Sequence, residues 1–186
     1  MNNVRNYTTE QLLNHASRME GFKGFPSTYW TLFVASNEDA NDRFDDKVYL
    51  FRGEKFVMVT SCTVNKGNKG TGVVCHNVWN YGAFGYGLHQ GKTPAGRQRV
   101  GFPYRRDFTN DGVTNPTSEV KKDIRGFNFH AASHDLKSKA IKTNIGGWSE
   151  GCMVLNNIPK YVEMLALLKP QKVWSMIIVT EFEPTN

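Results

Sequence analysis

The amino-acid sequence predicts a mostly β, single-domain protein, a β-sandwich or barrel with small helical additions. Many short runs of aromatic and β-branched residues alternate with polar, glycine-containing turns, which is typical of strands. Few segments show the apolar spacing of a helix. The length of 186 residues corresponds to about one domain of ordinary size, and no internal repeat or linker divides it. We expect a helical extension over residues 1–28 and the main domain over 29–186.

The first half of the chain shows one helix signal and then strand signals. Thr8, followed by Glu10 and Gln11, is a suitable N-cap for a short helix that ends before Gly21. The next strand-forming runs are 29–35, 47–51 and 55–64, with a polar loop over 36–46 and a hairpin turn over 52–54. These runs predict antiparallel neighbours in a sheet.

The second half continues the same pattern. Residues 72–91 are rich in glycine and aromatic side chains, which we interpret as the edge of a sheet near a site. Polar loops are predicted over 65–71 and 107–120, a strand over 127–130, a helix over 157–168 and a buried strand over 173–180. The balance of elements therefore favours strands.

Composition excludes several functional classes. The net charge of +6 is compatible with an anionic partner, but the basic residues form no dense block, so we predict no nucleic-acid binding. Three cysteines without a CxxC pair predict neither a disulfide framework nor a metal site, and we expect no cofactor. No export signal and no apolar run long enough to span a membrane are visible. We therefore expect synthesis in the cytoplasm, and the oligomeric state is left open.

The segment around Cys152 carries the strongest chemical signal. In Gly146-Gly-Trp-Ser-Glu-Gly-Cys-Met-Val154, the cysteine follows Gly151, whose lack of a Cβ permits a tight turn and a close approach to a ligand. Backbone N–H groups of such a turn can point at a developing oxyanion. A thiol becomes a strong nucleophile when a neighbouring base takes its proton. The alternative is that Cys152 is a small buried hydrophobic residue.

His130 is the candidate base. It ends the predicted strand, in which Phe127 and Phe129 alternate with Asn128 and His130, so His130 shares a face with Asn128. His134 competes for the role, and either histidine could instead be a solvated loop residue.

These residues occur in a recognisable order along the chain. Thr93-Pro94-Ala95-Gly96, then the histidine-containing strand, then Ser149-Glu150-Gly151-Cys152 together resemble the catalytic domain of the L,D-transpeptidase family, over roughly residues 47–180. The resemblance implies an L,D-transpeptidase-like fold with its site in a groove. It also implies acyl transfer through a cysteine thioester on the stem peptides of bacterial peptidoglycan.

The resemblance further implies a role for each residue. Cys152 would be the nucleophile and His130 the base, with the backbone N–H groups of Gly151 and Cys152 as the oxyanion hole. Ser149 would hold the turn, and a backbone carbonyl would orient the histidine. Four further residues would line the groove: Trp148, His134, Tyr86 and His89.

Two departures from the family pattern leave a second hypothesis open. Glu150 adds an acid beside the nucleophile, and we expect it to face outward. Val154 stands where an arginine is common. A catalytically idle fold that serves as a virion or cell-surface binding protein is therefore the alternative. Because the family acts on the cell wall, either the protein belongs to a bacteriophage and reaches the wall by lysis or within the particle, or the sequence lacks its leader.

Overall fold

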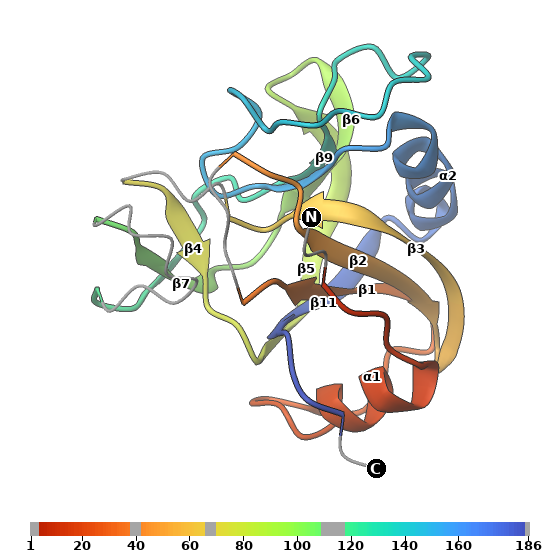
Figure 1. The fold of residues 1–186 in the computed structure, drawn as a ribbon, viewed down its shortest axis with the longest axis vertical. Coiled ribbons are helices and arrows are strands. Elements are labelled where there is room, and N and C mark those ends of the chain that lie inside the picture. The colour runs from red at the N-terminus through yellow and green to blue at the C-terminus, as the bar shows by residue number, and fades with distance from the viewer. Residues whose placement is uncertain (1–3, 38–41, 66–69, 109–117, 185–186) are drawn as a thin grey trace.

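The computed structural model describes residues 4–37, 42–65, 70–108 and 118–184. Eight of its strands close into a barrel in the order β1-β11-β5-β6-β9-β10-β3-β2, and a small sheet of β4, β7 and β8 lies beside it (Figure 1). The strands are β1 Tyr29–Ala35, β2 Asp46–Arg52, β3 Lys55–Thr63, β4 Gly72–Val74, β5 Val78–His89, β6 Thr93–Gln98, β7 Phe102–Arg106, β8 Lys121–Asp123, β9 Phe129–Ala131, β10 Met153–Leu155 and β11 Val173–Thr180. The mostly β prediction is confirmed.

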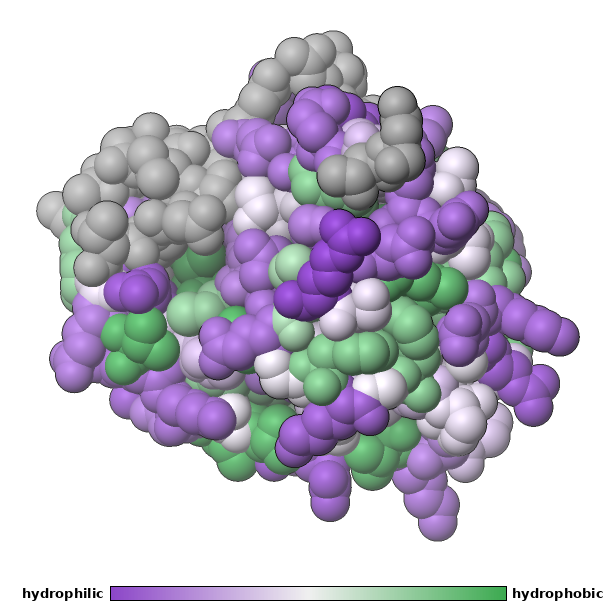
Figure 2. Space-filling view, turned by 90° about the horizontal axis from the view of Figure 1, so that it is seen from below, coloured by the Kyte–Doolittle hydropathy of each residue, from purple (hydrophilic) through white to green (hydrophobic). Residues whose placement is uncertain are grey.

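The N-terminal segment packs against the barrel. Helix α1, Thr9–Ala16, begins with the predicted cap: the Thr8 hydroxyl accepts from the Gln11 N–H, and the Gln11 side chain accepts from the Thr8 N–H. Leu12 and Ala16 belong to one buried cluster with Trp30 of β1. On the end of the molecule that carries α1, hydrophilic and hydrophobic residues are interspersed (Figure 2). Residues 4–28 thus share a core with the strands that follow them.

Helix α2, Ile158–Leu168, covers one side of the barrel and leads into the short 3-10 helix η1, Lys169–Gln171 (Figure 1). The Asn157 side chain caps the start of α2 by accepting from the Lys160 N–H. The buried face of α2 consists of Ile158, Tyr161, Met164, Leu165 and Leu168. This helical spacing matches the sequence prediction. No helix in the described part of the chain has the length and apolarity that a membrane span requires.

The glycine- and aromatic-rich segment lies differently from the prediction. Residues of β4 form an edge of the small sheet, but β5 lies inside the barrel between β11 and β6. Two glycines of β5 leave room for arginine side chains: a Cβ on Gly87 would lie 2.8 Å from Arg97, and one on Gly85 would lie 3.2 Å from Arg99. The edge prediction was wrong for β5, because this strand pairs with a neighbour on both sides.

The parallel pair β9 and β10 positions the predicted motifs. His130 is the register partner of Val154. Because the two strands are parallel, the loop that leaves the end of β9 returns to begin β10 beside the start of β9. The Met153 N–H donates to the Asn128 carbonyl oxygen at 2.9 Å. Cys152 and Asn128, which directly precede the two strands, are therefore neighbours.

Candidate active site

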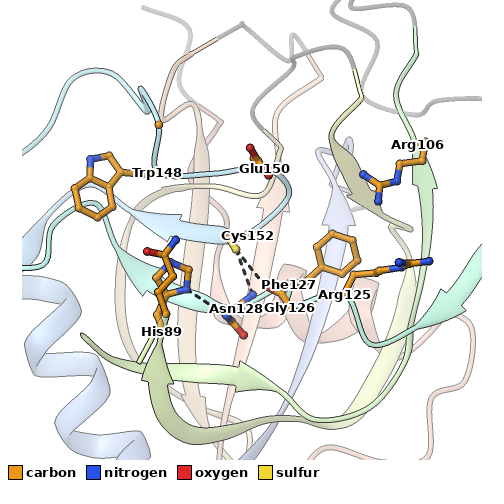
Figure 3. Close-up of a pocket in the computed structure, with 11 residues that line it drawn as sticks. His89, Arg106, Arg125, Gly126, Phe127, Asn128, Trp148, Glu150 and Cys152 are labelled. Atoms are coloured by element: carbon orange, nitrogen blue, oxygen red, sulfur yellow. Dashed lines mark hydrogen bonds between the residues drawn. The ribbon is translucent and has the colours of Figure 1, made fainter. Parts of the chain in front are cut away.

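A pocket of about 550 Å³ opens where the starts of β9 and β10 face the small sheet (Figure 3). Eleven residues line it: His89, Gln90, Arg106, Arg125, Gly126, Phe127, Asn128, Gly147, Trp148, Glu150 and Cys152. They come from β5, β7, the segment before β9 and the loop before β10. Three of the residues that the sequence singled out, Cys152, Trp148 and His89, thus line one cavity, whereas His130, Ser149, Gly151, His134 and Tyr86 do not line it.

The turn before Cys152 requires glycine at position 151. Gly151 has φ +121°, and a Cβ there would lie 2.3 Å from the Gly72 carbonyl oxygen and 2.7 Å from the Phe127 ring. The Ser149 hydroxyl accepts from the Gly151 N–H at 3.1 Å and donates to the Cys152 carbonyl at 3.0 Å. Ser149 therefore holds the turn from inside.

The Cys152 sulfur lies between two backbone groups of the opposite segment. Its thiol donates to the Gly126 carbonyl, and the Asn128 N–H donates to Sγ, both at 3.4 Å (Figure 3). Burial raises the pKa of Cys152 to about 11, the Asn128 N–H opposes this increase, and the Glu150 charge adds to it. The resting side chain is consequently a neutral thiol at pH 7.

His130 is a buried, neutral acceptor. Its Nδ1 lies 2.9 Å from the carbonyl oxygen of Ala131, so Nδ1 carries the proton and Nε2 presents a lone pair. Among the described residues, Nε2 has no hydrogen-bond partner. Burial lowers the pKa of His130 to about 4, with a smaller contribution from His89. A backbone carbonyl thus orients this ring.

His89 lies against His130 and completes a cluster with the thiol. The two rings stack with centroids 3.9 Å apart. One ring nitrogen of each histidine and the Cys152 Sγ all lie within 4.8 Å of one another. Burial and His134 lower the pKa of His89 as well. The cluster therefore combines a thiol with two neutral imidazoles.

The same three side chains are the natural candidates for a metal ion, but their hydrogen bonds oppose it. The Gln98 N–H donates to Asn128 Oδ1 at 3.0 Å, so Asn128 Nδ2 is the group that donates to His89 Nδ1 at 3.2 Å. Neutral His89 then carries its proton on Nε2, and no lone pair is left for a metal. The expectation of no metal stays a prediction, and the donor chemistry favours it.

The other predicted residues lie at different distances from the thiol. Trp148 lines the pocket, and Glu150 is exposed at its rim, as expected. His134 is exposed, contacts the edge of the Trp148 ring and forms a 2.6 Å hydrogen bond with Thr93. Tyr86 lies outside the pocket, with Lys169 Nζ 5.1 Å from its ring centroid. The structure thus brings His130 and His89 to Cys152, and leaves His134 at the margin and Tyr86 apart.

Sequence reasoning missed Gln98, which supports the segment opposite the thiol. Gln98 Oε1 accepts from three successive N–H groups, those of residues 125–127, at 2.8 to 3.1 Å. Its Nε2 donates to the carbonyls of Val100 and Asp123. No local pattern marks this residue, because its five partners are brought together by the fold.

No family model, curated protein or solved structure matches this chain. The L,D-transpeptidase resemblance therefore rests on the order of the sequence motifs.

Proposed function

We propose that this protein is a cysteine-dependent acyl-transfer enzyme acting on peptidoglycan stem peptides, as an L,D-transpeptidase or L,D-peptidase. One observation carries the proposal: Cys152 lines a pocket, and its sulfur lies within 4.8 Å of a ring nitrogen of His130. His130 is a buried, neutral histidine whose Nε2 has no hydrogen-bond partner among the described residues. A nucleophile with an oriented base beside it is the arrangement that covalent acyl transfer requires. The motif order of the chain supplies the substrate class.

The charge states of the pair favour general-base catalysis over a preformed thiolate. The pKa of Cys152 is raised and that of His130 is lowered, so a resting ion pair is unfavourable. As Sγ attacks the substrate carbonyl carbon, the thiol proton passes to His130 Nε2 and the carbonyl π electrons move to the oxygen. Collapse of this intermediate breaks the C–N bond, and the amine leaves with the proton from Nε2.

The thioester then accepts either an amine or water. His130 takes a proton from the incoming nucleophile and returns it to the departing sulfur. An amine acceptor gives a cross-link, and water gives hydrolysis. For the oxyanion, the Cys152 N–H is the candidate donor, because the Gly151 N–H is already directed at Ser149.

The decisive experiment compares purified muropeptides after incubation with the wild type, Cys152→Ala and Cys75→Ala. Cys75 is also a free, partly buried thiol but does not line the pocket, so its variant is the matched control. We expect new products from the wild type and Cys75→Ala, and none from Cys152→Ala. Equal product patterns from all three proteins, or no product from any, would refute the proposal.

A second candidate function is a catalytically idle module that binds the cell surface. The observation that favours it is the raised pKa of Cys152, to which the adjacent Glu150 contributes. Cosedimentation with insoluble peptidoglycan, run beside the muropeptide assay, separates the two functions. Retention of the protein on the wall without any product identifies the idle module.

A further inference from the structure

Two arginines form one end of the pocket. Figure 3 shows Arg106 and Arg125 on one side of Cys152, with Trp148 and His89 on the other. Glu150 is the one carboxylate among the eleven lining residues, so the two guanidinium groups outnumber it. The two guanidinium groups therefore lie on one side of the sulfur, together with the Phe127 ring, and Trp148 and His89 lie on the other.

Hydrogen bonds hold both the backbone and the side chain of Arg106. Its N–H donates to the Ser118 hydroxyl at 2.8 Å, and that hydroxyl donates to the Arg106 carbonyl at 2.7 Å. Its guanidinium donates to the Gly70 carbonyl at 2.8 Å and lies 5.8 Å from the centroid of the Tyr104 ring. Within the described ranges Arg106 forms no ion pair. A guanidinium has five N–H donors, and the bond to Gly70 is the one that the described residues show for this group.

Arg125 is anchored by the same aromatic residue. Its Nε donates to the Tyr104 hydroxyl at 3.0 Å, and its guanidinium pairs with Asp123 at 2.9 Å. Its backbone N–H is held by Gln98, in the segment that also supplies Gly126 to the thiol. Asp123 thus pairs with one of the two arginines, and in the part of the chain that the structure describes no carboxylate forms an ion pair with the other.

We infer that the arginine end binds a carboxylate of the substrate peptide next to the scissile bond; this inference rests on the proposed function. Guanidinium groups bind carboxylates with paired, charge-assisted hydrogen bonds. Val154 is fully buried in an apolar cluster that packs against Trp148 and Cys152, so it supplies no charge to the pocket. Arg106 and Arg125 supply the positive charge from other elements.

A peptide donor carries carboxylates on both sides of the scissile bond, one set on the acyl side and the C-terminal carboxylate on the leaving side. The experiment therefore uses three synthetic peptides: all carboxylates free, acyl-side carboxylates amidated, and leaving-side carboxylate amidated. Each is assayed with the wild type, Arg106→Gln, Arg125→Gln and Arg99→Gln. Arg99, directly after β6, is an exposed arginine that does not line the pocket, so it is the control.

We expect one of the two amidations to lower kcat/KM of the wild type by about tenfold or more, which identifies the bound carboxylate. Arg106→Gln and Arg125→Gln should lower kcat/KM for the free peptide by about tenfold and lose the discrimination between free and amidated peptide. Arg99→Gln should retain both. Equal turnover of the three peptides by the wild type, or full discrimination in both pocket variants, would overturn the inference.

Calorimetric binding to Cys152→Ala keeps this test separate from the proposed function. If the wild type gives no product, the proposed function fails. The carboxylate site still stands if the free peptide binds at least about tenfold more tightly than the amidated one and Arg106→Gln in the same background abolishes the difference. Equal affinities would overturn the carboxylate site, whatever the turnover result.

Discussion

The imidazole rings of His89 and His130 stack with 3.9 Å between centroids and 19° between planes, and their hydrogen bonds assign them opposite tautomers. His130 donates through Nδ1 to Ala131, whereas His89 accepts through Nδ1 from Asn128. Two stacked rings cannot easily both be positively charged imidazolium ions, because like charges in contact repel each other. In the proposed mechanism, a proton that His130 receives therefore faces a neutral partner, and it is returned readily.

The pH dependence of activity should reflect these two pKa values. General-base catalysis needs neutral His130 and a protonated thiol, which coexist between the His130 pKa of about 4 and the Cys152 pKa of about 11. We expect kcat/KM to stay level between about pH 6 and about pH 9. A rise through that window, as for a titrating thiolate, would contradict the mechanism.

Stability should fall in acid because of the buried histidines. The pKa values of His76 and His130 are both lowered to about 4 by burial, whereas an unfolded histidine has a pKa of about 6.5. The unfolded chain therefore binds more protons as pH falls from about 6.5 to about 4, and the free energy of unfolding decreases across that window. Urea denaturation at several pH values measures this. His76→Gln should flatten the dependence while leaving the pocket intact, and an unchanged slope in that variant would contradict its role.

Gly151→Ala should be destabilising. The new Cβ would meet the Gly72 carbonyl and the Phe127 ring, and alanine is strained at φ +121°. We expect a loss of about 1–3 kcal/mol or more in the free energy of unfolding. Gly147→Ala is the matched control, since a Cβ there meets nothing within 4 Å. Equal stabilities of the two variants would show that the turn relaxes.

Gln98→Leu should impair the site more than Gln98→Glu. Leucine leaves three N–H groups and two carbonyls of the neighbouring segment without their partner, at about 1–3 kcal/mol for each buried group. Glutamate keeps the acceptor for the three N–H groups. We expect kcat to fall further than KM rises, because Gly126 and Asn128 both contact the Cys152 sulfur. Identical kcat values for both variants would argue against a positioning role.

Removal of divalent metal should leave activity unchanged. The hydrogen bond from Asn128 occupies the His89 Nδ1 lone pair, so the three-residue cluster lacks a complete set of metal donors. Assays before and after treatment with a chelator test this. A loss of activity that added Zn²⁺ restores would assign the cluster to a metal.

Short-range patterns in the sequence determined several elements. The Thr8 cap with Gln11 placed α1, the apolar spacing over 157–168 placed α2, and the β-branched run over 173–180 placed β11. Each signal is local, because a cap, a helical face or a buried strand depends on residues that are close together in the sequence. The Gly151–Cys152 turn was visible for the same reason: one glycine beside one thiol suffices.

Only the tertiary structure decided which histidine meets Cys152 and what surrounds it. His130 lies there because β9 pairs in parallel with β10, while His134 leaves with the loop; spacing along the chain does not distinguish the two. Arg106 of β7 and Arg125 of the segment before β9 line the pocket, and Gln98 of β6 supports that segment from behind; no sequence period links the three. The candidate nucleophile thus stood out from local backbone requirements. The candidate base beside it, the residues that support it and the charge of its pocket depended on contacts between strands that are distant in the chain.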